Sequence, residues 1–354
     1  MTVHTSSSTL RIDALEYSVW DRTRFLEWRE GKLDAVHVTL AIWETSRETL
    51  RAVGEWTRHF YNNADLIMEA RTAADILEAK RQGKTAVILG LQNTTAFEDD
   101  LDLVWGFHSA GIRIAQLTYN IQNSVGSGCW ESEDSGISTH YGKHLLKEMN
   151  QVGMLIDISH CGERTCMDAI EISEVPIALT HGNPREFVGL DVALPMRNRS
   201  TELINLLAER GGVIGLSMYP RLAPGGDKCT LELFCDMVAW TVDLVGINHV
   251  GIGSDLYLGH EPKVINWWRM GRWARESAIP HSGLPTFPTW MDSPAKFGNI
   301  AEGLAKKGFS EDEQGLILGG NFLNLFDTIF SQKEATTSAR TPLVGGIGDG
   351  LLVG

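Results

Sequence analysis

The chain has 354 residues, of which 43% are hydrophobic and 21% are charged. This ordinary globular composition argues against intrinsic disorder, and the length allows one barrel-like domain or two smaller domains. The 45 acidic and 31 basic side chains give a net charge of −14. We therefore expect no nucleic-acid or anionic-membrane partner, because the chain offers no basic surface that could displace phosphate counterions.

The first residues and the cysteines indicate a soluble cytoplasmic protein. The stretch MTVHTSSSTLRID lacks the apolar segment of a secretory signal. No apolar run reaches the roughly 18 residues that span a bilayer. Five cysteines are scattered without CxxC spacing, which favours free thiols over disulfides or a cysteine zinc site.

Short apolar runs recur along the chain, and each is followed by a segment of helical character. They are nearly continuously apolar, as is typical of parallel strands covered on both faces. Helices are expected between them, for example at 141–152 and 201–210. The predicted strands are 10–17, 35–43, 85–92, 112–120, 154–160, 176–181, 212–219 and 249–255.

Eight strands that alternate with helices predict an α/β protein with a (β/α)8 barrel, the TIM-barrel architecture. An open doubly wound sheet is the main alternative, because alternation alone does not show closure. The absence of a Gly-x-Gly-x-x-Gly turn after the first strand disfavours a dinucleotide-binding version of that sheet. We predict one barrel domain over 1–332 and a flexible or subunit-contacting tail over 333–354.

An insertion over 256–291 follows the last predicted strand, so we expect it to lie over the mouth of the barrel. It contains four tryptophans, of which Trp268 and Trp290 are two. These side chains either pack a subdomain or dimer contact, or form a lid that lines an apolar substrate pocket. The other two tryptophans are Trp267 and Trp273.

Polar side chains gather at the carboxyl ends of the predicted strands, where barrel enzymes hold their active sites. His160, His181 and Asp255 end three different strands. Neutral imidazoles bind a cation such as zinc, and a nearby carboxylate orients a water molecule or moves its proton. These three residues therefore form the candidate catalytic centre, although a lone histidine at a strand end is more often structural.

Two other buried polar residues have structural interpretations. Asp157 shares a strand face with Ser159 and not with His160, which indicates a supporting role. His37 lies in the middle of a predicted strand, where a hydrogen-bonded core histidine is more common than a metal ligand.

The order of five sequence blocks carries a family resemblance that spans residues 10–326. The blocks are MLIDISHCGERT, VPIALTHGNPREF, MRNRSTELINLLAERGGVIGLSMYP, NHVGIGSDLYLG and LILGGNFLNLF. Together they resemble the membrane (renal) dipeptidase family, which consists of zinc-dependent (β/α)8 hydrolases of the amidohydrolase type. The resemblance implies that His160 and His181 are zinc ligands and that Asp255 handles the proton of the attacking water. It also implies that Arg197 pairs with the carboxylate of the substrate, a role that suits a forked, permanently charged group.

The chain departs from this family at the first zinc site. The family's first strand ends in Asp-Gly-His-x-Asp, whose histidine and second aspartate bind zinc, whereas residues 13–17 read Asp-Ala-Leu-Glu-Tyr. Leu15 and Tyr17 thus stand at the ligand positions. Gln92 stands at the position of the bridging glutamate, and Tyr119 at that of a substrate-binding histidine. We therefore expect no intact binuclear zinc centre, because no anionic bridge remains to hold two dications close together.

Three interpretations remain open. The first, which we favour, is a dipeptidase-like hydrolase that cleaves a C–N bond in a small peptide or amide with a free carboxylate. It would use one zinc or none, with the metal held by His160, His181 and Gln92, and Tyr119 and Asn183 would contact the substrate. The second is a metal-independent enzyme for a different small molecule, and the third is a non-catalytic binding homologue. The resemblance and the aromatic insertion favour a homodimer.

Overall fold

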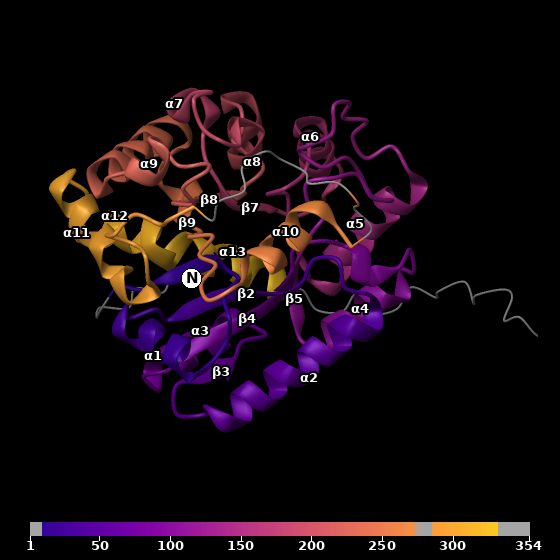
Figure 1. The fold of residues 1–354 in the computed structure, drawn as a ribbon, viewed down its shortest axis with the longest axis horizontal. Coiled ribbons are helices and arrows are strands. Elements are labelled where there is room, and N and C mark those ends of the chain that lie inside the picture. Colours follow the sequence, from indigo (N-terminus) through magenta and orange to yellow (C-terminus); the bar gives the residue numbers. More distant parts are fainter. Residues whose placement is uncertain (1–8, 273–274, 276–284, 332–354) are drawn as a thin grey trace, which may run out of the picture.

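The computed structural model describes residues 9–272, 275 and 285–331. Within these residues, one parallel sheet runs in the order β1-β2-β4-β5-β6-β7-β8-β9, and β3 pairs only with β4 (Figure 1). The strands are β1 Ile12–Glu16, β2 Ala35–Ala41, β3 Ile67–Glu69, β4 Thr85–Leu91, β5 Ile112–Gln116, β6 Leu155–Asp157, β7 Ala178–Gly182, β8 Val213–Leu216 and β9 Val250–Ile252.

The last strand returns to the first and nearly closes the sheet into a barrel. Just beyond β9, the Asp255 backbone N–H donates to the Leu15 carbonyl oxygen over 3.1 Å, and the Tyr17 N–H donates to the Leu256 oxygen over 2.8 Å. These bonds continue the parallel pairing where the strand ladders end. The predicted (β/α)8 barrel is confirmed, and the open-sheet alternative is wrong.

Helices surround the strands and connect them in sequence (Figure 1). Thr45 and Thr72 begin two of the helices with reciprocal side-chain and backbone bonds, which satisfy donors that the first turn leaves free. The predicted helices at 141–152 and 201–210 are α5 and α8. The helices are α1 Arg22–Glu30, α2 Ser46–Asn62, α3 Ala73–Arg81, α4 Asp102–Ser109, α5 His140–Val152, α6 Glu163–Ile172, α7 Arg185–Val188, α8 Thr201–Glu209, α9 Leu231–Val245, α10 Pro262–Met270, α11 Gly298–Lys306, α12 Glu311–Gly315 and α13 Asn321–Phe330.

An apolar cluster closes the amino-terminal end of the barrel. Phe322 and Phe326 of α13 are fully buried against strand residues such as Ile12 and Ile114. A separate, larger cluster fills the space between the strands and the outer helices. Because α13 fills one end with hydrocarbon, polar side chains that point into the barrel gather at its other end, where the strands finish.

The structure adds two elements that the sequence pattern did not predict. β3 is a three-residue strand with two half-buried residues, and α10 lies inside the 256–291 insertion. Trp273 and the predicted tail over 333–354 lie outside the described residues, so the predicted domain limits stay predictions. All five cysteines are buried free thiols, as expected. Of the helices described, none combines the length and the apolar character that a bilayer crossing requires.

Candidate active site

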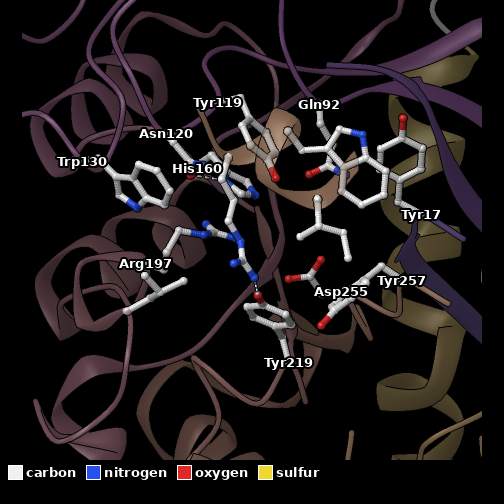
Figure 2. Close-up of a pocket in the computed structure, with 14 residues that line it drawn as sticks. Tyr17, Gln92, Tyr119, Asn120, Trp130, His160, Arg197, Tyr219, Asp255 and Tyr257 are labelled. Atoms are coloured by element: carbon white, nitrogen blue, oxygen red, sulfur yellow. Dashed lines mark hydrogen bonds between the residues drawn. The ribbon is translucent and has the colours of Figure 1, made fainter. Parts of the chain in front are cut away.

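A pocket with an empty volume of about 540 Å³ opens at the carboxyl ends of the strands. Figure 2 shows His160, Arg197 and Asp255 around this pocket, together with Gln92 and several aromatic rings. The strands bring these groups together from positions far apart in the sequence. The complete lining is Tyr17, Gln92, Tyr119, Asn120, Trp130, His160, Leu194, Arg197, Tyr219, Asp255, Tyr257, Ile265, Trp268 and Arg269.

The two predicted ligand histidines face each other. His160 lines the pocket, His181 is fully buried, and their Nε2 atoms lie 3.0 Å apart. His160 Nδ1 lies 2.6 Å from Asn120 Oδ1, and His181 Nδ1 lies 2.9 Å from Thr180 Oγ1. An amide oxygen only accepts hydrogen bonds, so His160 carries its proton on Nδ1.

The same reasoning fixes the tautomer of His181. The Thr180 hydroxyl donates to Asp157 Oδ2 over 2.6 Å, so its oxygen accepts the proton of His181 Nδ1. Burial, with a further contribution from Arg197, lowers the pKa of both rings well below the ordinary value. Two neutral imidazoles therefore direct Nε2 lone pairs at the same point, which is the arrangement that suits a shared cation.

Asp157 supports this histidine pair through hydrogen bonds to Ser159 and Thr180, the residues that precede the two histidines. Its carboxylate accepts the Ser159 N–H and hydroxyl and the Thr180 N–H and hydroxyl, over 2.5 to 3.1 Å. It does not line the pocket. The supporting role that strand alternation indicated agrees with these contacts.

Arg197 is 2% exposed and lines the pocket. Its Nη1 donates to the Ser159 carbonyl oxygen, whereas its buried Nη2 has no hydrogen-bond partner in the described part of the chain. A buried guanidinium nitrogen without a partner is costly, so Nη2 provides a donor for an anionic group in the pocket.

Asp255 reaches the pocket from a left-handed backbone conformation, with φ of 57°. This conformation is unfavourable for a non-glycine residue, and the bond from its N–H to Leu15 holds it in place. Burial raises the pKa of its carboxyl to about 7, although Arg197 acts in the opposite direction. A carboxyl group that titrates near neutral pH is suited to proton transfer.

The side chains that the ends of β1 and β4 add to the pocket wall, Tyr17 and Gln92, are neutral, although the buried Asp13 of β1 is close enough to raise the pKa of Asp255. Leu15 is fully buried, and the Tyr17 ring stacks on Trp268 with centroids 4.2 Å apart. Gln92 Nε2 donates to Thr39 Oγ1 over 2.7 Å, so its carbonyl oxygen is the atom left for a ligand. Beyond the end of β5, the Tyr119 ring stacks on His160 with centroids 4.0 Å apart.

A binuclear zinc centre does not fit these residues. Two dications held close together require anionic ligands between and around them, and the positions in question carry Leu15, Tyr17 and Gln92. In the part of the chain that the structure describes, no three or more His, Cys, Asp or Glu side chains group as a metal site. A single metal fits better, because His160 and His181 have the required tautomers and Gln92 offers a neutral oxygen.

The structure does not bring Asn183 into the pocket. Its side-chain amide accepts the Ser217 N–H over 2.9 Å and donates to the Ser217 carbonyl over 3.0 Å. These bonds tie the end of β7 to the end of β8, so its position does not support the predicted contact with substrate. His37, as expected, is a core residue whose Nδ1 bonds the Ala14 carbonyl at 2.6 Å.

Sequence reasoning missed several residues of the lining. Arg269, on α10, donates to the Tyr219 hydroxyl over 3.0 Å. Ile265, Trp268 and Arg269 are three and four positions apart, which is the spacing of one helix face, so this signal was present in the insertion. Tyr219 and Asn120 end predicted strands but carry no charge that would mark them.

Comparison with known proteins finds dipeptidases among the relatives of this chain. The family profile described as "Membrane dipeptidase (Peptidase family M19)" matches residues 12–266. Dipeptidase tcpJ of Claviceps purpurea is 24% identical over 85% of this chain and 64% of its own length. The uncharacterized dipeptidase C965.12 of Schizosaccharomyces pombe is 28% identical over 59% of this chain and 50% of its own length. The chain thus spans between half and two thirds of these curated relatives.

Solved structures match over nearly their whole length. An amidohydrolase from Pseudomonas aeruginosa is 30% identical with a TM-score of 0.86, over 91% of this chain and 97% of that one. A metallo peptidase from Rhodobacter sphaeroides, liganded with a phosphinate mimic of the dipeptide L-Ala-D-Ala, shares the fold with a TM-score of 0.74 at 17% identity, over 91% of this chain and 100% of that one. Because the family profile covers most of the chain and these structures share its barrel, the chain belongs to the membrane dipeptidase family, peptidase family M19.

Proposed function

We propose that the protein hydrolyses the C–N bond of a small peptide-like or amide substrate with a free carboxylate, using at most one metal ion. The observation that carries this proposal is the pairing, in one pocket, of the unpartnered Arg197 Nη2 with the Asp255 carboxyl. One group binds an anion and the other moves a proton. Family membership supports the reaction class.

The carboxylate of the substrate would bind at Arg197. The Ser159 carbonyl holds one arm of this guanidinium and leaves the other for the ligand. Arg269 adds a second positive charge to the lining, against the one carboxylate of Asp255. Electrostatics in the pocket therefore favour an anionic substrate over a neutral one.

Asp255 would accept a proton from the attacking water and return it to the leaving amine. A pKa of about 7 suits both halves of this transfer near neutral pH. Rings of Tyr119, Tyr257 and Trp268 cover the pocket and limit competing water.

A zinc ion bound by His160, His181 and the Gln92 amide oxygen would polarise the scissile carbonyl and lower the pKa of a bound water. Elemental analysis of protein purified without chelator tests this point. We expect no more than one zinc per chain. Two tightly held zinc ions would contradict the proposed site.

A second candidate, a metal-independent enzyme of the same fold, is favoured by the neutral Tyr17 and Gln92 side chains of the pocket wall and by the Asp255 pKa near 7. In that case Tyr17 would act as a hydrogen-bond donor and not as a base, because burial raises the pKa of its hydroxyl. Turnover that persists after complete removal of metal by chelation would select this candidate. Loss on chelation and recovery with one equivalent of zinc would select the metal-dependent hydrolase.

A screen of dipeptides and N-acyl amino acids, each beside its carboxamide, tests the substrate class. We expect release of the amine from the free acids and much slower release from the carboxamides. Equal rates on acids and carboxamides would contradict the role of Arg197. The absence of turnover on the whole panel would contradict the proposed hydrolysis.

A further inference from the structure

A second cavity, which we name the aromatic cavity, lies beside the active-site pocket and has an empty volume of about 610 Å³. It lies between the loop that follows β1, the end of β2, one face of α2 and the segment before α10. Tyr17 lines both this cavity and the active-site pocket. The aromatic cavity is lined by Tyr17, Ser18, Val19, Trp20, Thr39, Leu40, Ala52, Glu55, Trp56, His59 and His260.

Two groups of packed rings line the aromatic cavity. Trp56 lies 5.3 Å from Trp20 and 5.3 Å from His59, measured between ring centroids. On the other side, His260 lies 5.5 Å from Tyr17. The residues that α2 contributes are spaced three and four positions apart, so one face of this helix forms a wall. Ring faces of this kind carry negative electrostatic potential and attract cations.

Glu55 is the one lining side chain of the aromatic cavity that carries a formal charge at neutral pH. It lies at the exposed rim, and its carboxylate makes no hydrogen bond or ion pair within the described part of the chain. Burial lowers the pKa of both His59 and His260, so these rings are neutral. The Glu55 carboxylate acts against burial and raises the pKa of His59, and two charges outside the lining, Arg58 and Asp21, lower and raise it respectively.

One lining nitrogen also lacks a partner. His260 Nε2 is buried and has no hydrogen-bond partner among the described residues. The backbone of Ser18 and of Tyr17 interacts with the His260 ring and raises its pKa against burial. An unpartnered ring nitrogen has one hydrogen bond to exchange with a ligand, and the Glu55 carboxylate attracts positive charge. An apolar, aromatic wall, one negative charge and one unpartnered ring nitrogen are complementary to the same kind of ligand.

We propose that the aromatic cavity is a second ligand site that binds an organic ammonium ion with an apolar body. The apolar body packs against Trp20 and Trp56, and the ammonium group lies toward Glu55. The site is separate from the pocket that holds Asp255, with Tyr17 as a shared wall. This proposal does not depend on the hydrolytic function, because none of its residues except Tyr17 lines the active-site pocket.

Titration of the full chain with benzylammonium chloride, followed by calorimetry and by tryptophan fluorescence, tests the site. Benzyl alcohol is the neutral ligand of nearly the same shape. We expect benzylammonium to bind about five-fold more tightly than benzyl alcohol, since a cation gains from the ring faces at a partly exposed site. Equal affinity for the two compounds would overturn the proposal.

Two substitutions locate the binding. Ala52→Leu places a larger side chain in the aromatic cavity from the α2 face, and we expect it to weaken benzylammonium at least about ten-fold by steric exclusion. Glu55→Gln removes only the rim charge, and we expect about a three-fold loss, as for an exposed ion pair. The matched control is Glu30→Gln, an exposed carboxylate on α1 that does not line the cavity, which should leave the affinity unchanged.

Because Ala52→Leu also changes packing, a melting curve accompanies each variant. If Ala52→Leu does not fold, the comparison of Glu55→Gln with Glu30→Gln decides the question. Equal affinities in those two variants, or undiminished binding in a folded Ala52→Leu variant, would place the ammonium ion elsewhere and overturn the proposal.

Discussion

The two sides of the active-site pocket differ in the charge of their side chains and in their expected roles. The side built by β6, β7 and the segment after β9 carries His160, His181 and Asp255, and Arg197 joins it from the loop after β7. On the opposite side, the residues that follow β1 and β4 and line the pocket, Tyr17 and Gln92, are neutral. The predicted catalytic side chains thus lie on one half of the barrel rim, while the neutral side chains of the other half bound the pocket.

Packing explains what the neutral side does. Tyr17 stacks on Trp268 of α10, and Trp43 Nε1 donates to the Trp268 carbonyl oxygen over 2.6 Å. These contacts, with Tyr119 and Ile265, form a separate apolar cluster over the pocket. A charged side chain at position 17 would be desolvated by this cluster.

The substitution with the largest expected effect on turnover removes the proton-transfer group, Asp255. Asp255→Asn keeps size and hydrogen bonding but cannot transfer the proton. We expect turnover of a dipeptide to fall about 10³-fold, within the usual range for a general acid–base group. Stopped assays of amine release, with circular dichroism to show an intact barrel, measure this change. Full activity in the variant would remove Asp255 from the mechanism.

The next effect concerns recognition of the substrate. Arg197→Ala deletes the donor to the substrate carboxylate, and a charge-assisted bond of this type is worth roughly 1.5–3 kcal/mol. We expect kcat/KM on a free dipeptide to fall by about 10- to 100-fold in consequence. Kinetics on the free acid and on its carboxamide measure the change.

The carboxamide serves as the internal control for this substitution. Its rate should change little, because it has no anion to lose. Arg197→Lys keeps the charge without the fork and should give an intermediate rate. Equal losses on acid and carboxamide would show that Arg197 is needed only for the fold of the loop.

The barrel was predictable because each parallel strand is covered on both faces and therefore reads as an apolar run. The predicted strand at 154–160 illustrates the limit, because β6 ends at Asp157. Ile158 still donates to the Ala178 carbonyl over 3.0 Å, so the extended chain continues beyond the ladder. β3 was not predictable in this way, since its three residues pair with one neighbour and two of them are half-buried.

The active half of the pocket was also predictable, because His160, His181 and Asp255 end strands that parallel pairing brings to one rim. Arg269 was not placed in advance, and for Trp268 a lid over the pocket was only one of two interpretations. Their position depends on how α10 lies across Tyr17 and Trp43, which is a tertiary contact without a local pattern. Asn183 shows a limit of this signal, since a polar residue at a strand end also bonds the backbone of a neighbouring strand.

The neutral side of the pocket is tested by removing the Trp268 ring, which lies over it. Trp268→Ala deletes a ring that is 5% exposed and lines the pocket. We expect affinity for a substrate with an aromatic side chain to fall about ten-fold, and that for a glycine dipeptide to fall less. The adjacent Trp267→Ala is the matched control, because Trp267 does not line the pocket. Unchanged affinity in Trp268→Ala would show that α10 is packing and not a lid.

The last test is the pH dependence of stability that Asp255 contributes, beside the contribution of Asp13, whose pKa burial also raises to about 7. Burial raises the pKa of Asp255 to about 7 in the folded chain, above its value of 3.8 when unfolded. Between these values the folded state binds more protons, so stability falls as the pH rises through this window. Asp255→Asn removes this contribution and should gain at most about 4 kcal/mol relative to the natural chain between pH 4 and pH 8, at roughly 1.4 kcal/mol per pKa unit. Urea unfolding at both pH values measures it, and the exposed Asp227→Asn substitution controls for net charge. A stability difference that does not change with pH would mean that Asp255 ionises freely in the fold, and the proton-transfer role would then lose its physical basis.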